Sequence, residues 1–180
     1  MNYYATARTN YFHVTNEAKF KQLMAGLSAE GGCHSVKDDN DPTMYAILFD
    51  GSASFYRPAS LVPEFMETIE GKTVYDDKQT PIPIDEIDSH NCLYDEEGEC
   101  IFDRWADDDE FDFFLKEIVK IIPENECFVY MESGYEGHRY IVGYAVVATK
   151  NGTKHMNLSS FVDNAVKELL GPDAKTKYEY

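Results

Sequence analysis

The residues best suited to chemistry lie close together near the middle of the chain. Asp88, His90 and Cys92 are spaced two residues apart, and they offer a carboxylate, an imidazole and a thiol for acid–base, nucleophilic or metal chemistry. A catalytic pair must come within hydrogen-bond reach, and nothing in this spacing requires it. We therefore predict that these are ordinary surface residues. A metal hydrolase that uses His90 with Asp88 is the alternative, and metal analysis of the purified protein would test it.

Two further motifs resemble functional sites only in composition. The acidic runs DEEGE and ADDDEFD lack the alternating ligands, central glycine and twelfth-position glutamate of an EF-hand calcium loop. The glycines of ESGYEGHRYIVGY join two strands and do not open a helix, so they do not form a phosphate-binding loop. The sequence accordingly predicts a protein that is not an enzyme and that has no cofactor and no metal site.

The charge of the chain is concentrated in one segment. Residues 85–112 carry thirteen acidic side chains against Arg104 alone, a net charge of −12, whereas the other 152 residues contribute only −5 of the total of −17. Such a field repels nucleic acid and anionic membranes, and it attracts basic protein surfaces over a range that salt shortens. We therefore predict a basic protein partner, with no direct nucleic-acid binding and no membrane binding.

The same segment predicts where that partner binds. An aromatic side chain among carboxylates suits a protein interface, since the ring supplies binding energy and the carboxylates steer the encounter. Trp105 is the predicted anchor, and the alternative is a core tryptophan that covers the following helix. The predicted partner-binding residues are Asp95, Glu96, Glu97, Glu99, Asp103, Trp105, Asp107, Asp108, Asp109 and Glu110.

Apolar residues at helical spacing predict the helices that position these side chains. We expect helices over about residues 16–27, 108–121 and 158–170, with a short helix at about 61–69. Thr15 is the expected N-cap of the first helix, and Asn157 or Ser159 that of the last. Asp107, Asp108 and Asp109 would favour the start of the second helix, because the positive end of its dipole attracts carboxylates.

The strands that the sequence predicts should pair mostly antiparallel. We expect a bent strand or strand pair at the start of the chain, a buried strand in MYAILFDG, and an acidic-tipped hairpin in NCLYDEEGECIF. Strands at about 126–132 and 139–149 should pair antiparallel, the second ending at Asn151 and Gly152. The predicted class is α+β, an antiparallel sheet and hairpins packed against about three helices. We expect a single domain, 1–180, and leave room for an irregular acidic insertion at about 52–106.

The cysteines and the chain start indicate the compartment. The first twenty residues lack the features of a signal peptide, and no apolar run reaches eighteen residues. We therefore predict a soluble, cytoplasmic protein. Cys33, Cys92, Cys100 and Cys127 contain no CxxC spacing and should be reduced thiols, although Cys92 and Cys100 could face each other across the hairpin.

Both ends of the chain resemble a known group of proteins. The opening MNYYATARTNYFHVTNEAKFKQLM and the closing PENECFVYMESGYEGHRYIVGYAVVATKNG are similar to small acidic proteins encoded by phages and mobile elements of gut bacteria. That group includes an anti-CRISPR family that inhibits type II-A Cas9. The resemblance covers about half of the chain and leaves out the acidic middle.

The resemblance implies a non-enzymatic inhibitor that binds Cas9 with its guide RNA and prevents target DNA from being bound or cut. Cas9 holds nucleic acid in positively charged channels, so an acidic, DNA-mimicking surface could compete there; an allosteric lock on a nuclease domain is the other binding mode. An immunity or antitoxin protein that neutralises a basic nuclease toxin would show the same acidity and remains the alternative function.

Overall fold

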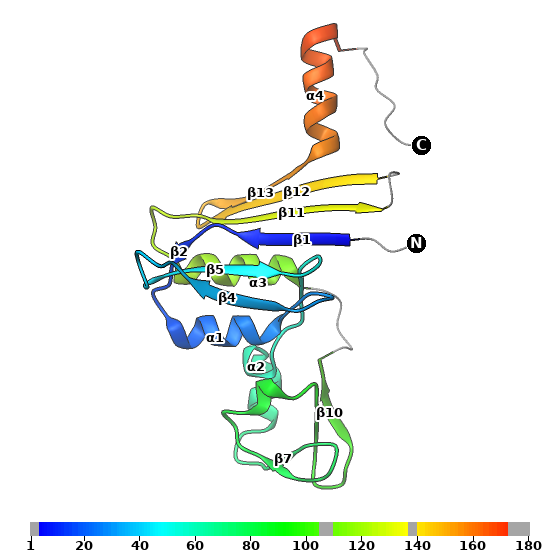
Figure 1. Ribbon diagram of the computed structural model, residues 1–180. Helices are drawn as coiled ribbons and strands as arrows, with labels where there is room; N and C mark the ends of the chain where they lie inside the picture. Colours follow the sequence, from blue (N-terminus) through cyan, green and yellow to red (C-terminus); the bar gives the residue numbers. More distant parts are fainter. Residues whose placement is uncertain (1–3, 105–109, 137–139, 173–180) are drawn as a thin grey trace.

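The computed structural model describes residues 4–104, 110–136 and 140–172, which form an α+β fold of antiparallel sheets and helices (Figure 1). This confirms the predicted fold class. The strands are β1 (Tyr4–Thr9), β2 (Phe12–His13), β3 (Leu27–Ser28), β4 (Cys33–Lys37), β5 (Met44–Phe49), β6 (Ser54–Phe55), β7 (Val74–Tyr75), β8 (Pro81–Ile82), β9 (Cys92–Tyr94), β10 (Cys100–Asp103), β11 (Phe128–Glu136), β12 (Tyr140–Thr149) and β13 (Gly152–Asn157). The α-helices are α1 (Glu17–Gly26), α2 (Pro63–Thr68), α3 (Phe111–Ile118) and α4 (Leu158–Leu170), and the 3-10 helices are η1 (Ala59–Leu61), η2 (Ile87–Ser89) and η3 (Val119–Ile121).

The largest sheet has seven strands in the order β13-β12-β11-β1-β5-β2, and β4 pairs with β5. β1 and β2 both pair with β5, through Ala7 opposite Phe49 and Phe12 opposite Tyr45. The chain start is therefore one bent strand, as predicted. β3 and β6 form a separate pair.

The C-terminal half of this sheet is a three-stranded meander. β11 and β12 pair antiparallel from Phe128 opposite Ala148 to Glu136 opposite Tyr140, which confirms the predicted hairpin. The predicted second strand ended at Asn151 and Gly152, with no strand after it. In the structure the chain turns there and returns as β13, whose six residues are all exposed. Sequence reasoning missed β13 because GTKHMN is mostly polar and shows no alternation of buried and exposed positions.

Two helices cover one face of the sheet and close the main core. α1 and α3 begin within three residues of their predicted starts. α3 continues into η3, which ends at Ile121 as predicted. The N-cap of α1 is Asn16, which accepts a hydrogen bond from the Lys19 amide; the predicted cap, Thr15, instead donates its hydroxyl to the Ile121 carbonyl, 2.9 Å away. The largest fully buried side chains of this core include Phe12, Leu23, Phe55, Phe114, Phe128 and Tyr130.

The last helix departs from the prediction. α4 has the predicted bounds, and Asn157 caps it by accepting a hydrogen bond from the Ser160 amide. We expected about three helices against the sheet, but α4 stands away from it, beyond β13 (Figure 1). Helical periodicity specifies an apolar stripe and does not specify what the stripe packs against. Of the helices in the described ranges, none is long and apolar enough to cross a lipid bilayer.

Residues 58–104 form a second compact unit, which we call the acidic lobe. It contains η1, α2, η2 and a four-stranded sheet in the order β10-β9-β7-β8. Its own apolar cluster consists of Ala59, Phe65, Ile69, Val74, Ile82, Ile87 and Leu93. The hairpin of β9 and β10 and the short helix α2 were predicted, whereas the strands β7 and β8 were not. Two-residue strands between prolines carry too little periodicity to be recognised.

Candidate functional site

The tip of the β9–β10 hairpin presents the predicted carboxylates to solvent. Asp95 accepts hydrogen bonds from the Glu97 and Glu99 amides, at 3.1 and 2.8 Å, and so holds the turn in shape. Glu96, Glu97 and Glu99 are exposed. Within the described residues, no ion pair joins these three glutamates to a lysine, arginine or histidine. The tip is therefore a group of carboxylates whose charge the fold leaves unbalanced.

The lone basic residue of the acidic segment does not neutralise this surface. Arg104 lies partly buried, where its guanidinium donates to the Asp88 carbonyl and its amide donates to the Asn91 carbonyl. Burial lowers the pKa of Arg104, against the opposite effect of the Asp88 charge. Because Arg104 is used to hold the loop before β9 against the end of β10, the outer surface of the lobe is left acidic.

Folding brings further carboxylates to the lobe that sequence reasoning missed. The acidic lobe carries thirteen acidic and three basic residues, a net charge of −10 in 47 residues. Glu64, Glu67 and Glu70 are exposed on and just after α2, while Asp76 and Asp77 lie in the turn between β7 and β8. The linear count from 85 to 112 omitted these five residues, because only the packing of α2 and β7 against β9 gathers them with the hairpin.

The lobe also has an open depression with an apolar floor and a charged rim. Its volume is about 580 Å³, and its lining residues are Met66, Glu67, Ile69, Glu70, Gly71, Lys72 and Ile84. Ile84 is 54% exposed. Such a depression could accept an apolar side chain of a protein partner, while the Glu67 and Glu70 charges beside it steer the encounter.

One predicted site residue is engaged inside the protein. Glu110, at the N-cap position of α3, accepts two hydrogen bonds of 2.6 Å from the Arg57 guanidinium, and this guanidinium also stacks on the Phe113 ring. A bidentate pair of this kind fixes the segment that enters the lobe after β6 to the start of α3, so we exclude Glu110 from the candidate surface. Asp103 stays within it, exposed at the end of β10. Trp105, Asp107, Asp108 and Asp109 lie outside the described residues.

The alternative catalytic set is not assembled. The Asp88 carboxylate accepts hydrogen bonds from the Ser60 amide, at 2.9 Å, and from the Ser60 hydroxyl, so it stabilises η1 and is not directed at His90. Burial and the nearby Asp103 charge raise the pKa of the Cys92 thiol, which lowers its nucleophilicity. Cys92 lies opposite Asp103 and not opposite Cys100, and all four cysteines are free. The described residues contain no cluster of three metal-binding side chains.

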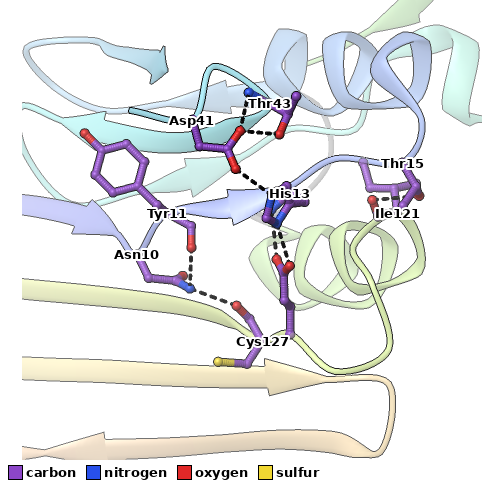
Figure 2. A network of polar contacts seen from close by, with 9 residues as sticks. Asn10, Tyr11, His13, Thr15, Asp41, Thr43, Ile121 and Cys127 are labelled. Carbon is purple, nitrogen blue, oxygen red and sulfur yellow. Dashed lines mark hydrogen bonds and ion pairs between the residues drawn. The ribbon is translucent and has the colours of Figure 1, made fainter. Parts of the chain in front are cut away.

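A second polar cluster surrounds His13, in strand β2 of the seven-stranded sheet (Figure 2). Nδ1 of His13 lies 2.5 Å from the Glu126 carboxylate, and Nε2 lies 3.2 Å from Asp41. The Glu126 hydrogen bond is the main cause of the raised pKa of His13, and Asp41 adds to it. Both ring nitrogens are occupied, so the imidazole is not available to a substrate. The cluster ties β2, the β4–β5 turn and the segment before β11 together.

This cluster predicts a pH-dependent stability. A histidine whose pKa is raised on folding stabilises the protein fully below its unfolded value of 6.5, and that contribution is lost as the pH rises through the folded value. We therefore expect His13→Gln to lower the melting temperature more at pH 6 than at pH 9. His34→Gln, at an exposed position of β4, is the control and should cost the same at both pH values. An equal loss at both pH values for His13→Gln would contradict this role.

Comparison with known proteins does not identify a function for these residues. No protein-family model matches the chain, and neither a curated protein nor a solved structure matches it.

Proposed function

We propose that the protein is a non-enzymatic inhibitor that binds a basic, nucleic-acid-handling protein through the acidic lobe. The observation that carries this proposal is the set of exposed carboxylates at the hairpin tip, which make no ion pair with any residue in the described ranges, on a lobe of net charge −10. Maintaining so many like charges on a small unit opposes its folding. A partner that supplies lysines and arginines would remove this repulsion, and the interaction would strengthen at low salt.

The partner we propose first is the Cas9 complex with its guide RNA, on the strength of the resemblance of both chain ends to anti-CRISPR proteins. Cas9 binds its target in a positively charged channel and reads the adjacent motif with arginines. The Glu96, Glu97 and Glu99 side chains are exposed on the turn of the β9–β10 hairpin, at the edge of the lobe's four-stranded sheet, where they can face the basic wall of such a channel. Occupation of the channel would block target DNA from being bound or cut.

A second candidate function is an immunity protein against a basic nuclease toxin. The depression beside α2 supports it, because Ile84 and Met66 offer apolar contacts to a folded partner surface and Glu67 and Glu70 lie beside them. The two functions differ in which partner is bound. Titration of the protein against a Cas9–guide RNA complex and against basic nucleases, with inhibition of cleavage as the readout, separates them.

The experiment that tests the acidic surface uses two variants with the same change in net charge. The first is Glu96→Lys, Glu97→Lys and Glu99→Lys, which leaves Asp95 in place because its carboxylate holds the turn. The control is Glu30→Lys, Asp39→Lys and Glu124→Lys, three exposed positions on the main body. His90→Ala is a further control and should keep partner binding and inhibition within a few-fold of the parent.

We expect the tip variant to associate with the Cas9–guide RNA complex roughly tenfold more slowly at low salt, whereas the control should lose much less. The parent's association rate should fall with salt, and the tip variant's should fall less steeply. Stopped-flow or surface-based kinetics at two salt concentrations measure both. Equal losses in the two variants, or a salt-independent rate in the parent, would rule out binding through the hairpin tip.

A further inference from the structure

One face of the seven-stranded sheet carries no carboxylate. The buried residues of β5, β11 and β12, such as Phe49, Tyr130 and Val146, point to the face that α1 and α3 cover. Because side chains alternate along a strand, their neighbours in sequence point to the opposite face, which we call the open face. In the described parts of β13, β12, β11, β1, β5 and β4, no residue on the open face is acidic, although 33 of the 180 residues of the chain are.

The open face is mostly apolar. Strand register places six of its residues in one row across six strands: His34, Leu48, Arg8, Met131, Ala145 and Met156. Met131 is 45% and Met156 is 44% exposed. Val129 and Val147, both partly exposed, continue the apolar surface in the next row. A contiguous apolar surface of this kind indicates an interaction site, whereas single exposed apolar residues do not.

Arg8 lies in the middle of this apolar row with its charge unbalanced. It is exposed, and it forms no ion pair with a described residue. Its Nε donates to the Thr9 carbonyl, 3.2 Å away, which holds the guanidinium close to β1. A guanidinium has five N–H donors, so its terminal nitrogens remain available for a bidentate contact with a carboxylate.

An open depression of about 470 Å³ lies beside Arg8. From the open face it is lined by Thr6, Arg8, Leu48, Met131 and Ser133. Glu132 also lines it, but the Glu132 carboxylate accepts hydrogen bonds from the Ser52 and Tyr130 hydroxyls, at 2.7 and 2.6 Å, on the covered side of the sheet. The open face therefore gives the depression two apolar side chains, a guanidinium and two hydroxyls.

We propose that the open face binds a segment of a protein partner in which a carboxylate lies between apolar side chains. The carboxylate would pair with Arg8, and the apolar side chains would lie on Leu48 and Met131. A basic segment is disfavoured here because Arg8 and Lys154 would repel it. This chemistry is opposite to that of the acidic lobe, so the proposal does not depend on the function proposed for the lobe.

Other occupants match this surface less well. Two copies that met through their open faces would bring together surfaces without a carboxylate, so Arg8 and Lys154 would face like charges across the interface. Nucleic acid would find a phosphate contact at Arg8, but the side chains on both sides of Arg8 in the row, Leu48 and Met131, are apolar and not basic. Nucleic-acid surfaces normally surround their aromatic or apolar groups with basic ones.

Two matched peptides test the proposal on the full chain. Both are capped pentapeptides with two leucines, and they carry either a glutamate or a glutamine between the leucines. We expect both to shift the backbone amide signals of Arg8, Met131 and Ser133 in NMR spectra, and the glutamate peptide to bind roughly three- to fivefold more tightly, as an exposed ion pair allows. Long-range repulsion from a chain of net charge −17 would favour the neutral peptide. Equal binding, tighter binding of the glutamine peptide, or no shift at these amides would overturn the proposal.

Two variants that each remove one positive charge locate the contact. Arg8→Gln should abolish the preference for the glutamate peptide and keep the binding of the glutamine peptide. Lys21→Gln, at an exposed position of α1, is the control and should keep the preference. Met131→Ser should weaken both peptides by a similar factor, because it removes an apolar contact and leaves Arg8 in place. A preference that survives Arg8→Gln, or that Lys21→Gln removes equally, would overturn the role of Arg8.

Two further measurements distinguish the other occupants. If sedimentation showed a parent dimer that Met131→Glu makes monomeric, the open face would bind a second copy. If a thymidine oligonucleotide of about ten nucleotides shifted the same amides at lower concentration than the glutamate peptide does, the open face would bind nucleic acid. Either result would overturn the proposal, and we expect neither.

Discussion

Replacing Phe114 by alanine is expected to lower the free energy of unfolding by about 3–5 kcal/mol, the usual cost of deleting a fully buried aromatic ring. Phe114 is 0% exposed. Its ring centroid lies 5.4 Å from Phe55, 5.5 Å from Phe111 and 5.5 Å from Phe128. The ring therefore joins α3 to β6 and to the central strand β11.

Urea unfolding followed by circular dichroism measures this loss. Phe113→Ala is the matched control, since it makes the same change one residue earlier in α3, at a position where the ring is only partly buried. We expect Phe113→Ala to lower the free energy of unfolding clearly less than Phe114→Ala does. The dependence of that free energy on urea concentration should stay similar in both variants. Equal losses at the two positions would show that α3 does not hold the core through Phe114.

Leu93→Ala is expected to unfold the acidic lobe while the seven-stranded sheet remains. Leu93 is 0% exposed and lies in the lobe's own cluster of seven buried residues. A buried leucine deleted to alanine typically costs 2–5 kcal/mol, which is comparable to the whole stability that so small an apolar cluster can supply. Because we propose that the lobe binds the partner, we also expect affinity for the Cas9–guide RNA complex to fall by more than about tenfold.

Hydrogen exchange separates the local effect from a global one. Amides of β9 and β10 should lose their protection in Leu93→Ala, while those of β11 and β12 should keep theirs. Ile84→Ala, an aliphatic truncation at a 54% exposed position of the same lobe, should leave protection unchanged. Loss of protection in both regions would mean that the lobe and the main sheet unfold as one unit.

The elements that the sequence predicted share a physical property. α1, α3 and α4 have an apolar stripe and a polar residue or a proline at their ends, and the sequences of β11 and β12 are rich in β-branched and aromatic residues. These are local signals, so they act within one or two turns of the chain. The β9–β10 hairpin and its acidic tip were predictable for the same reason, since a short turn fixes the pairing of its own strands.

The elements and contacts that were missed depend on residues distant in sequence. β13 is a strand because it pairs with β12, not because of its own pattern. Glu110 could not be removed from the candidate surface without its bidentate contact with Arg57, 53 residues away. Glu67 and Glu70 belong to the acidic surface of the lobe only because α2 packs beside the hairpin.

By itself the sequence determined the α+β class, the main helices and strands, and the concentration of negative charge, because composition and short-range periodicity are properties of neighbouring residues. Only the tertiary structure decided which carboxylates face solvent, that Arg104 turns inward, and that Phe161 and Leu169 of α4 are largely exposed. Each of these depends on what a side chain meets after the backbone has packed. Hydrogen bonds, ion pairs and buried apolar contacts form between surfaces that the chain brings together only on folding.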